Sequence, residues 1–352
     1  MKINKGQFFL SWRKQLEFSY RRATGHILPY IRNRFKWHFY PRMKYVSKFP
    51  DHVDLELAST CEMKCPMCYT TNDLYKQTVP KKVMRPELFK KCVDECAKYG
   101  VYSIRLSLRG EPFINKHIVE LIRYAKQKGI KEVSTLTNGL QLNPEMFVQV
   151  MEAGLDWLTI SFDGMGETYN RIRAPAKFDE AVEKIRTYHR IKKERGSLKP
   201  VIKIQAVWPS IKDSAREFYD LFNPIVDNIA SNPLIDFHHE THEIIYEKNF
   251  TCPVLYQRLV VASDGRVLLC SNDEYGRYIV GDTNTQSLYD IWHGEKMEKA
   301  RELHLKHIGY KELSPCKDCY LPRKTLAAKE KIGGKDIVVD KYVGAPELIT
   351  KF

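Results

Sequence analysis

The sequence predicts an α/β fold in which a partial (β/α)6, TIM-like barrel is followed by a small cysteine-rich domain. Between residues 53 and 208, short β-rich runs alternate with helical segments. After about residue 240 the alternation stops, and four cysteines follow. Strands that alternate with helices of about 10 to 15 residues form right-handed βαβ units and a parallel sheet. Six or so such units would form an open, partial barrel.

The expected strands and helices follow one another along the chain. We expect strands over residues 53–58, 102–108, 133–139, 157–164 and 201–208. We expect helices over residues 86–100, 117–129, 144–154 and 178–195. In such folds ligands gather at the carboxyl ends of the strands. Motifs that follow a strand are therefore the candidates for a functional site.

The C-terminal part has a different pattern. Residues 258–270 form an expected hairpin with Asp264-Gly265 as its turn, and residues 287–304 form one expected helix before a cysteine pair. The tail is polar and weakly patterned. We therefore divide the chain into a basic aromatic extension, a barrel domain, a cysteine-rich domain and a tail: residues 1–50, 51–240, 241–333 and 334–352.

The first 50 residues carry most of the net charge. They contain twelve Lys and Arg residues and one acid, Glu17, so they hold +11 of the chain's +14. Aromatic residues lie between the cations, and we expect one or two helices packed outside the barrel domain. Three roles stay open: a helical cap with solvated cations, docking on an anionic membrane surface, or binding of a polyanion such as nucleic acid.

The composition predicts a globular, cytoplasmic protein. A hydrophobic content of 43% in 352 residues can supply a core. No apolar run approaches the roughly 18 residues of a spanning helix, and the first residues lack the features of a signal peptide. Because cytoplasmic thiols stay reduced, the nine cysteines indicate metal binding or catalysis rather than disulfides.

Cys61, Cys65 and Cys68 have the spacing C-x3-C-x2-C directly after the first expected strand. Three thiolates on one tight loop can bind three irons of a 4Fe–4S cubane and leave the fourth iron open. A tetrahedral zinc site would need a fourth ligand nearby. A zinc knuckle or an unrelated cysteine loop is the alternative. The spacing and its place after the first strand resemble the radical S-adenosylmethionine (SAM) superfamily.

This resemblance implies that SAM binds the open iron of a catalytic cluster held by the three cysteines. One electron from the reduced cluster would cleave SAM to a 5′-deoxyadenosyl radical, which abstracts a hydrogen atom from the substrate. The electron would come from a donor such as flavodoxin or ferredoxin. Met67, just before Cys68, occupies the position that the family places over the adenine.

Motifs after later strands carry the same resemblance. The segment 109–112, Arg-Gly-Glu-Pro, resembles the family's GGEP motif, and this implies that Gly110 and Glu111 bind the SAM ammonium group. Arg109 replaces the first glycine, and we expect the function to survive because the hydrogen bonds come from the later positions. Asn138, after the third strand, is implied to contact the ribose. Ser161 and Arg173 resemble the pair that clamps the SAM carboxylate.

Cys252, Cys270, Cys316 and Cys319 form a second group, with the spacing C-x12-G-x4-C followed by C-x2-C. Four thiolates can saturate a second 4Fe–4S cluster. The arrangement resembles the SPASM auxiliary domains, specifically the shortened twitch form with one cluster. A four-cysteine zinc ribbon is the alternative.

Two further groups have weaker patterns. Cys92 and Cys96 share one helix face, where they are either core residues or a hydrogen-donating thiol. His238, His239, Glu240 and His242 do not have the H-E-x-x-H spacing of zinc proteases, so we expect a polar loop near the barrel mouth.

Three functions are compatible with these motifs. The first is a radical SAM enzyme that oxidises, epimerises or dehydrates a hydroxylated small molecule such as a sugar or cyclitol. The second is a maturase of ribosomally made peptides, although the first 50 residues are too short for the usual leader-binding domain. The third is a nucleic-acid or membrane-surface binder with structural clusters, which leaves the SAM-site motifs unexplained.

Overall fold

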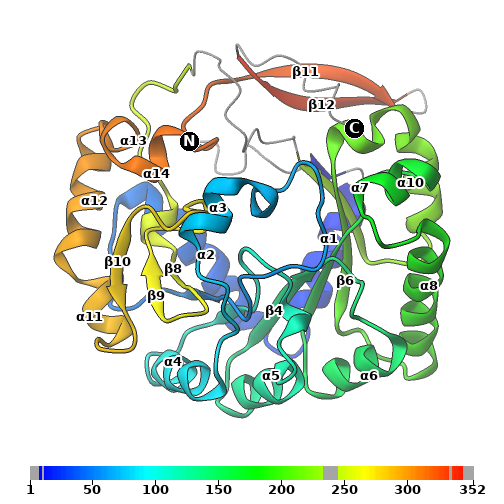
Figure 1. The fold of residues 1–352 in the computed structure, drawn as a ribbon, viewed down its shortest axis with the longest axis horizontal. Coiled ribbons are helices and arrows are strands. Elements are labelled where there is room, and N and C mark those ends of the chain that lie inside the picture. The colour runs from blue at the N-terminus through cyan, green and yellow to red at the C-terminus, as the bar shows by residue number, and fades with distance from the viewer. Residues whose placement is uncertain (1–7, 10–11, 233–244, 333–334, 344–352) are drawn as a thin grey trace.

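The computed structural model describes residues 8–9, 12–232, 245–332 and 335–343 (Figure 1). Six parallel strands, β2 to β7, lie side by side in sequence order, as a (β/α)6 arrangement requires. In the described residues β7 is not paired with β2, so the barrel is open. The strands of this unit are β2 (His52–Leu55), β3 (Ser103–Arg105), β4 (Glu132–Thr137), β5 (Trp157–Ser161), β6 (Val201–Val207) and β7 (Asn228–Asn232).

Helices connect these strands and lie outside them, with α4 to α6 along the lower edge of Figure 1 and α8 and α10 at its right. Their apolar faces and the strands form one continuous core, in which Val53, Phe89, Leu121 and Phe147 are fully buried. The helices are α3 (Asp73–Thr78), α4 (Pro86–Lys98), α5 (Ile118–Gln127), α6 (Pro144–Glu152), α7 (Gly166–Ile172), α8 (Phe178–Glu194), α9 (Trp208–Ile211) and α10 (Ala215–Phe222).

The structure adds a sixth barrel strand that the sequence pattern did not locate. Strand β7 contains two asparagines and a serine, and this composition lowers its apparent strand propensity. Asn228 and Ser231 are nevertheless buried. The Asn228 side chain donates to Gln15 of the N-terminal extension at 2.9 Å, and Ser231 pairs with Phe8 at the edge of the sheet. Strand β1 (Phe8–Phe9) pairs antiparallel with β7 at the edge of the sheet.

The C-terminal domain continues the same sheet. Strand β8 (Arg258–Val261) pairs in parallel with β2, and β9 (Arg266–Leu268) and β10 (Ile279–Asp282) extend the sheet beyond it. The expected hairpin is present, and Gly265 adopts a φ of +96° in its turn. This left-handed backbone favours glycine.

Two C-terminal features differ from expectation. The single expected helix is two helices, α11 (Leu288–Trp292) and α12 (Glu295–Leu305), separated at Gly294. Short helices α13 (Gly309–Glu312) and α14 (Ser314–Lys317) carry the chain to the last cysteines. The expected weakly patterned tail contains β12 (Lys335–Tyr342), which pairs with β11 (Thr325–Ile332) in a separate two-stranded sheet. The boundary placed after residue 333 therefore falls between two paired strands.

The N-terminal helices α1 (Trp12–Ala23) and α2 (Ile27–Met43) pack on residues that begin barrel strands. The ring of Phe18 lies 5.3 Å from that of Trp157, the first residue of β5. The ring of Trp37 lies 5.8 Å from that of His52, the first residue of β2. These two helices therefore cover the amino-terminal end of the barrel.

A buried ion pair fixes α1 to this end. Arg22 donates two hydrogen bonds to Glu132, at 2.9 and 2.7 Å, and its guanidinium lies 4.2 Å from the centre of the Trp157 ring. Both charged side chains are buried.

Among the described residues, no helix is long and apolar enough to span a membrane.

Removing the arginine of this pair should destabilise the fold. Arg22→Met would leave Glu132 buried without its partner, and we expect a loss of about 3 kcal/mol or more in unfolding free energy. Urea unfolding of the anaerobically prepared protein measures it. The control is Arg13→Met on the exposed side of the same helix, which should cost less than about 0.5 kcal/mol. Equal losses in the two variants would show that α1 is not anchored through Arg22.

Candidate active site

The first cysteine group lies on the loop that follows β2. Cys65 is buried, Cys61 and Cys68 are half-buried, and none of the nine cysteines forms a disulfide. The amide of Cys68 donates to the carbonyl of Cys65 at 3.0 Å, which tightens the loop. Burial raises the pKa of Cys61 to about 12 and also raises the pKa of Cys65. These thiols would become thiolates readily only beside a strong positive partner such as iron.

The loop after β3 crosses the cysteine loop at Gly110. A side-chain carbon at this position would lie 2.3 Å from the carbonyl oxygen of Thr60, which is too close for any atom pair. The amide of Glu111 donates to the same carbonyl at 2.8 Å. Glycine at position 110 therefore allows the two loops to touch directly beside Cys61.

The carboxylate of Glu111 connects three chain segments. It accepts hydrogen bonds from the amide of Phe113 at 3.1 Å, the hydroxyl of Thr137 at 2.7 Å and the amide of Asn138 at 2.8 Å. Burial raises the pKa of Glu111 to about 7, although these three donors oppose the rise. A carboxylate offers about four acceptor positions, so one remains for a cationic ligand.

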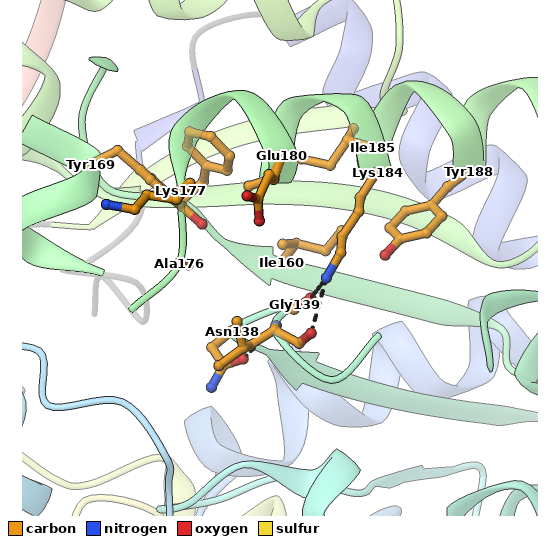
Figure 2. Close-up of a pocket in the computed structure, with 13 residues that line it drawn as sticks. Asn138, Gly139, Ile160, Tyr169, Ala176, Lys177, Glu180, Lys184, Ile185 and Tyr188 are labelled. Carbon is orange, nitrogen blue, oxygen red and sulfur yellow. Dashed lines mark hydrogen bonds between the residues drawn. The ribbon is translucent and has the colours of Figure 1, made fainter. Parts of the chain in front are cut away.

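Asn138 lies between the first cysteine and a crevice beside α8. Its amide nitrogen is 3.6 Å from the sulfur of Cys61, and its side-chain oxygen accepts from the amide of Leu140 at 2.8 Å. From α8, the ammonium of Lys184 donates to the carbonyls of Gly139 and Leu140 at 3.3 and 2.9 Å (Figure 2). The loop that carries Asn138 is therefore held from both sides.

Arg173 follows α7 and lies close to Cys65. Its guanidinium pairs with Asp163, whose other oxygen accepts from the amide of Val207 at 2.7 Å. The positive charge of Arg173 opposes the rise in the pKa of Cys65, so the two groups interact electrostatically. Two of the five N–H groups of this guanidinium donate to Asp163, which leaves three for a carboxylate.

The remaining predicted residues lie in the same region. Ser161 is the last residue of β5, two positions before Asp163, and is half-buried. Met67 is partly buried against the main core beside Cys68. Apart from Arg173, which follows α7, the predicted residues thus lie on the segments that follow β2, β3 and β4 or at the end of β5. Their individual roles stay predictions.

The second cysteine group is also brought together. Burial raises the pKa of Cys270, and the neighbouring Cys316, Cys319 and Cys252 raise it further. The amide nitrogen of the Asn272 side chain lies 3.7 Å from the sulfur of Cys319. Four free, mostly buried thiols from separate segments therefore surround one region.

The donor chemistry of both groups fits iron–sulfur clusters. In a cubane each thiolate binds a different iron, so the sulfurs stand apart around the cluster. The ligands of a single zinc ion instead converge on one point. Within the described ranges, no group of three or more His, Cys, Asp or Glu side chains converges in this way.

Sequence reasoning missed the partner of Arg109. Arg109 donates two hydrogen bonds of 2.6 Å to Glu56, just after β2, and both side chains are buried. Glu56 also accepts from the amide and hydroxyl of Ser263, each at 2.9 Å, in the turn after β8. The arginine that replaces glycine therefore links the barrel to the C-terminal domain.

A cavity of about 340 Å³ lies inside the barrel and reaches residues beside the second cysteine group. Leu108 and Leu136 line it, and they directly precede the Arg109 and Thr137 segments. Residues that follow three cysteines of the second group also line it: Pro253, Val254, Ser271, Asn272, Tyr320 and Leu321. This volume is within the range of small-molecule sites.

The described residues of this site include neither the cysteine pair of α4 nor the histidine-rich segment. Cys92 and Cys96 on α4 are buried in the hydrophobic core, and burial raises the pKa of both thiols. This position agrees with the structural interpretation. The cluster of His238, His239, Glu240 and His242 lies outside the described residues.

Comparisons with protein families match both halves of the chain. Residues 55–204 match the radical SAM superfamily, and residues 252–320 match an iron–sulfur cluster-binding domain, SPASM. The first match runs from the last residue of β2 into β6 and includes the first cysteine group. The second begins and ends at the second cysteine group.

Several curated proteins are similar over part of the chain. An Fe-coproporphyrin III synthase of Methanosarcina barkeri is 29% identical over 51% of this chain and 41% of its own length. An S-adenosylmethionine-dependent nucleotide dehydratase of Lacinutrix mariniflava is 33% identical over 37% of this chain and 27% of its own length. A tungsten-containing aldehyde ferredoxin oxidoreductase cofactor-modifying protein of Pyrococcus furiosus is 25% identical over 72% of each chain. The first relatives are thus matched over less than half of their lengths.

Solved structures share the fold at low identity. BtrN in complex with AdoMet and 2-DOIA has a TM-score of 0.53 and 18% identity, and the match covers 78% of this chain and 94% of BtrN. Streptococcus suis SuiB bound to S-adenosylmethionine has a TM-score of 0.55 and 14% identity over 88% of this chain and 84% of SuiB.

The two cysteine groups together should determine the iron content of the protein. Anaerobically reconstituted protein should contain about eight irons, four for each cubane. Replacing Cys61, Cys65 and Cys68 with Ala should leave about four. The control is Cys92→Ala with Cys96→Ala, which should retain about eight because these thiols lie in the core. Metal analysis and absorption spectroscopy measure both, and tightly bound zinc in the triple variant would contradict the assignment of the second group.

Proposed function

Because this chain belongs to the radical SAM superfamily and carries a SPASM domain, we propose that it abstracts a hydrogen atom from a hydroxylated small molecule and so oxidises, epimerises or dehydrates it. The two domains imply S-adenosylmethionine and two 4Fe–4S clusters as cofactors. The observation that carries the proposal is the cavity of about 340 Å³ inside the barrel, which residues beside the second cysteine group also line.

The cofactors would supply a 5′-deoxyadenosyl radical when bound, and the chain's own residues would position the reactants. Cys61, Cys65 and Cys68 would hold the catalytic cluster. Glu111 would accept the SAM ammonium through its remaining acceptor position, and Arg173 would donate to the SAM carboxylate. Gly110 would act through the backbone, because its contact with Thr60 keeps the Glu111 loop beside Cys61.

The remaining SAM contacts would come from three side chains around this centre. Asn138 would contact the ribose, Ser161 the carboxylate and Met67 the adenine. Asn138 follows the last residue of β4, Ser161 is the last residue of β5, and Met67 lies beside Cys68 on the loop after β2. An external donor such as flavodoxin or ferredoxin would supply the electron.

The polar lining of the cavity favours a hydroxylated substrate. Ser134, Thr159, Gln205 and Asn272 line it and can bind hydroxyl groups in either hydrogen-bonding sense. Several relatives are named for a nucleotide or for GTP, and one solved neighbour contains 2-DOIA. A peptide-modifying function is the alternative, because other neighbours are named for a peptide or were solved with a precursor peptide.

The SAM site predicts a specific loss of affinity. Arg173→Ala should weaken SAM binding about 10 to 150-fold, since a hydrogen bond to a charged group contributes about 1.5 to 3 kcal/mol. Glu111→Ala should weaken it by a similar factor. The control is Arg171→Ala, two residues from Arg173 and exposed to solvent, which should bind SAM normally.

The readouts are SAM binding and 5′-deoxyadenosine formation by reduced, reconstituted protein. The iron content of Arg173→Ala should stay near eight per chain. A loss of SAM affinity in this variant can then not be explained by loss of a cluster. Unchanged SAM affinity in both Arg173→Ala and Glu111→Ala would refute the assigned roles. Absence of 5′-deoxyadenosine from the wild-type protein would refute the enzymatic proposal.

We also propose that the N-terminal helices dock on an anionic membrane surface. On α2, Leu28, Ile31, Phe35, Phe39 and Met43 are exposed and recur every three or four residues, so they form one apolar stripe. Leu28 is 79% exposed. Asn33 lies on the other side of α2, where it is buried and donates a hydrogen bond to Asp51.

Exposed aromatic and basic residues flank this stripe. Trp12, Leu16 and Tyr20 are exposed on α1 at intervals of four. Several cations of the extension are used internally, as Arg22 and Lys36 pair with buried or half-buried acids. Exposed cations remain, among them Arg13, Arg32, Arg42, Lys44 and Lys48. Each contributes about 1 kcal/mol near an anionic leaflet, so the exposed cations together with the exposed apolar residues favour a position at the membrane surface.

Liposome co-sedimentation tests the docking. Wild-type protein should bind vesicles that contain phosphatidylserine at low salt, and less at high salt. Replacing Leu28, Phe35 and Phe39 with Ser should reduce binding at least tenfold. The matched control replaces Leu74, Leu198 and Leu326, which are exposed elsewhere, with Ser.

Removal of residues 1–50 is unsuitable, because it would uncover the buried Glu132 and the ring of Trp157. Failure of the wild-type protein to bind anionic vesicles at low salt would refute the docking. Tighter binding to a nucleic-acid duplex than to vesicles, lost at high salt, would favour the polyanion alternative.

A further inference from the structure

The charged residues of the barrel cavity are all cations. Arg105 from β3, Lys203 from β6 and Arg258 from β8 line it, and no Asp or Glu does so among the described residues. A cavity lined by one sign of charge attracts ligands of the opposite sign.

The two arginines share one buried acid behind the cavity wall. Arg105 Nε lies 2.8 Å from Asp54 Oδ1, and Arg258 Nη1 lies 3.2 Å from Asp54 Oδ2. His52 also contacts Asp54, and burial lowers the pKa of this histidine, so it adds no charge at neutral pH. One carboxylate therefore faces two guanidinium groups, and a net positive charge remains at the wall.

Lys203 adds a third cation. Its side chain is buried, and its ammonium lies 6.0 Å from the centre of the Trp157 ring. Burial and the neighbouring Arg22 lower the pKa of Lys203 to about 7. Both influences disfavour the charged form, whereas an anion in the cavity would favour it.

Several buried hydrogen-bond donors in the cavity lining have no acceptor in the described structure. The indole N–H of Trp157 and the Nε–H of Arg258 can only donate, and neither has a hydrogen-bond partner in the described structure. The hydroxyl of Thr135 is likewise buried and without a partner there. Buried polar groups in native proteins are nearly always satisfied, so a ligand that offers acceptor oxygens fits this wall.

We propose that the substrate carries an oxyanion, either a phosphate ester or a carboxylate, which binds between Arg105, Arg258 and Lys203. This inference rests on the proposed function, since it places the oxyanion in the cavity assigned to the substrate. By sheet register Arg105 pairs with Ser134, Lys203 with Thr159 and Arg258 with His52. The three cations therefore lie at levels of the sheet that precede the SAM-site residues at the carboxyl ends of the strands. The oxyanion therefore orients the rest of the substrate toward the SAM site.

Direct anion binding tests the proposal. Reconstituted protein with SAM is titrated with inorganic phosphate, with acetate and with uncharged glycerol, and tryptophan fluorescence reports binding because Trp37 and Trp157 line the cavity. We expect saturable binding of at least one anion and none of glycerol. Tighter binding of phosphate would identify a phosphate ester as the substrate group, and tighter binding of acetate a carboxylate.

Variants localise the site. Lys203→Met, similar in volume, and Arg105→Gln should each weaken anion binding tenfold or more, whereas Lys203→Arg should retain most of it. The control Lys90→Met removes an exposed lysine paired with Glu120 on the outside and should bind anions as the wild type does. Equal anion affinity in wild type, Lys203→Met and Arg105→Gln would overturn the proposal.

The experiments can overturn the oxyanion site and the proposed enzymatic function independently of each other. Wild-type protein that forms 5′-deoxyadenosine but binds neither phosphate nor acetate would overturn the oxyanion site and leave the enzymatic proposal standing. Wild-type protein that binds an anion in a Lys203-dependent way but never cleaves SAM would support the oxyanion site and overturn the enzymatic proposal.

Discussion

The contact between Gly110 and Thr60 is the constraint on which the candidate site depends. The segment after β3 can pass directly over the segment before Cys61 only because position 110 has no side chain. This passage places Glu111 against the start of the cysteine loop, and the carboxylate then holds Thr137 and Asn138 from the next strand. Three successive strand ends are thus fixed relative to one another by one glycine and one buried acid.

Much of this arrangement is predictable from the sequence, because it depends on local patterns. Apolar runs located five of the six barrel strands, and cysteine spacing with strand-end motifs located the candidate site. Strand β7 was missed because its asparagines and serine lower its apparent strand propensity, although Asn228 and Ser231 are buried. The cavity cations could not be grouped from the sequence, since Arg105, Lys203 and Arg258 are far apart along the chain and meet only when the strands curve around one interior.

The role of Arg109 could not be predicted either, because its partner is distant in the sequence. The sequence shows an arginine where a glycine is typical, and this suggests only a tolerated substitution. Its partner, Glu56, is 53 residues away and has an acidic side chain like many others in the chain. The N-terminal extension shows the same limit: its charge is plain in the sequence, but only the structure separates Arg22, which is buried against Glu132, from the exposed cations beside the apolar stripe of α2.

The Arg109–Glu56–Ser263 link, together with the pairing of β8 and β2, affects how this chain could have been assembled in evolution. A domain appended through a flexible linker can be gained or lost while its neighbour stays folded. Here, deletion of the C-terminal domain would expose the edge of β2 and leave Glu56 and Arg109 without their Ser263 anchor. The two domains are therefore expected to be inherited as one unit, and a chimera that exchanges the C-terminal domain would have to supply donors to Glu56 at the position of Ser263.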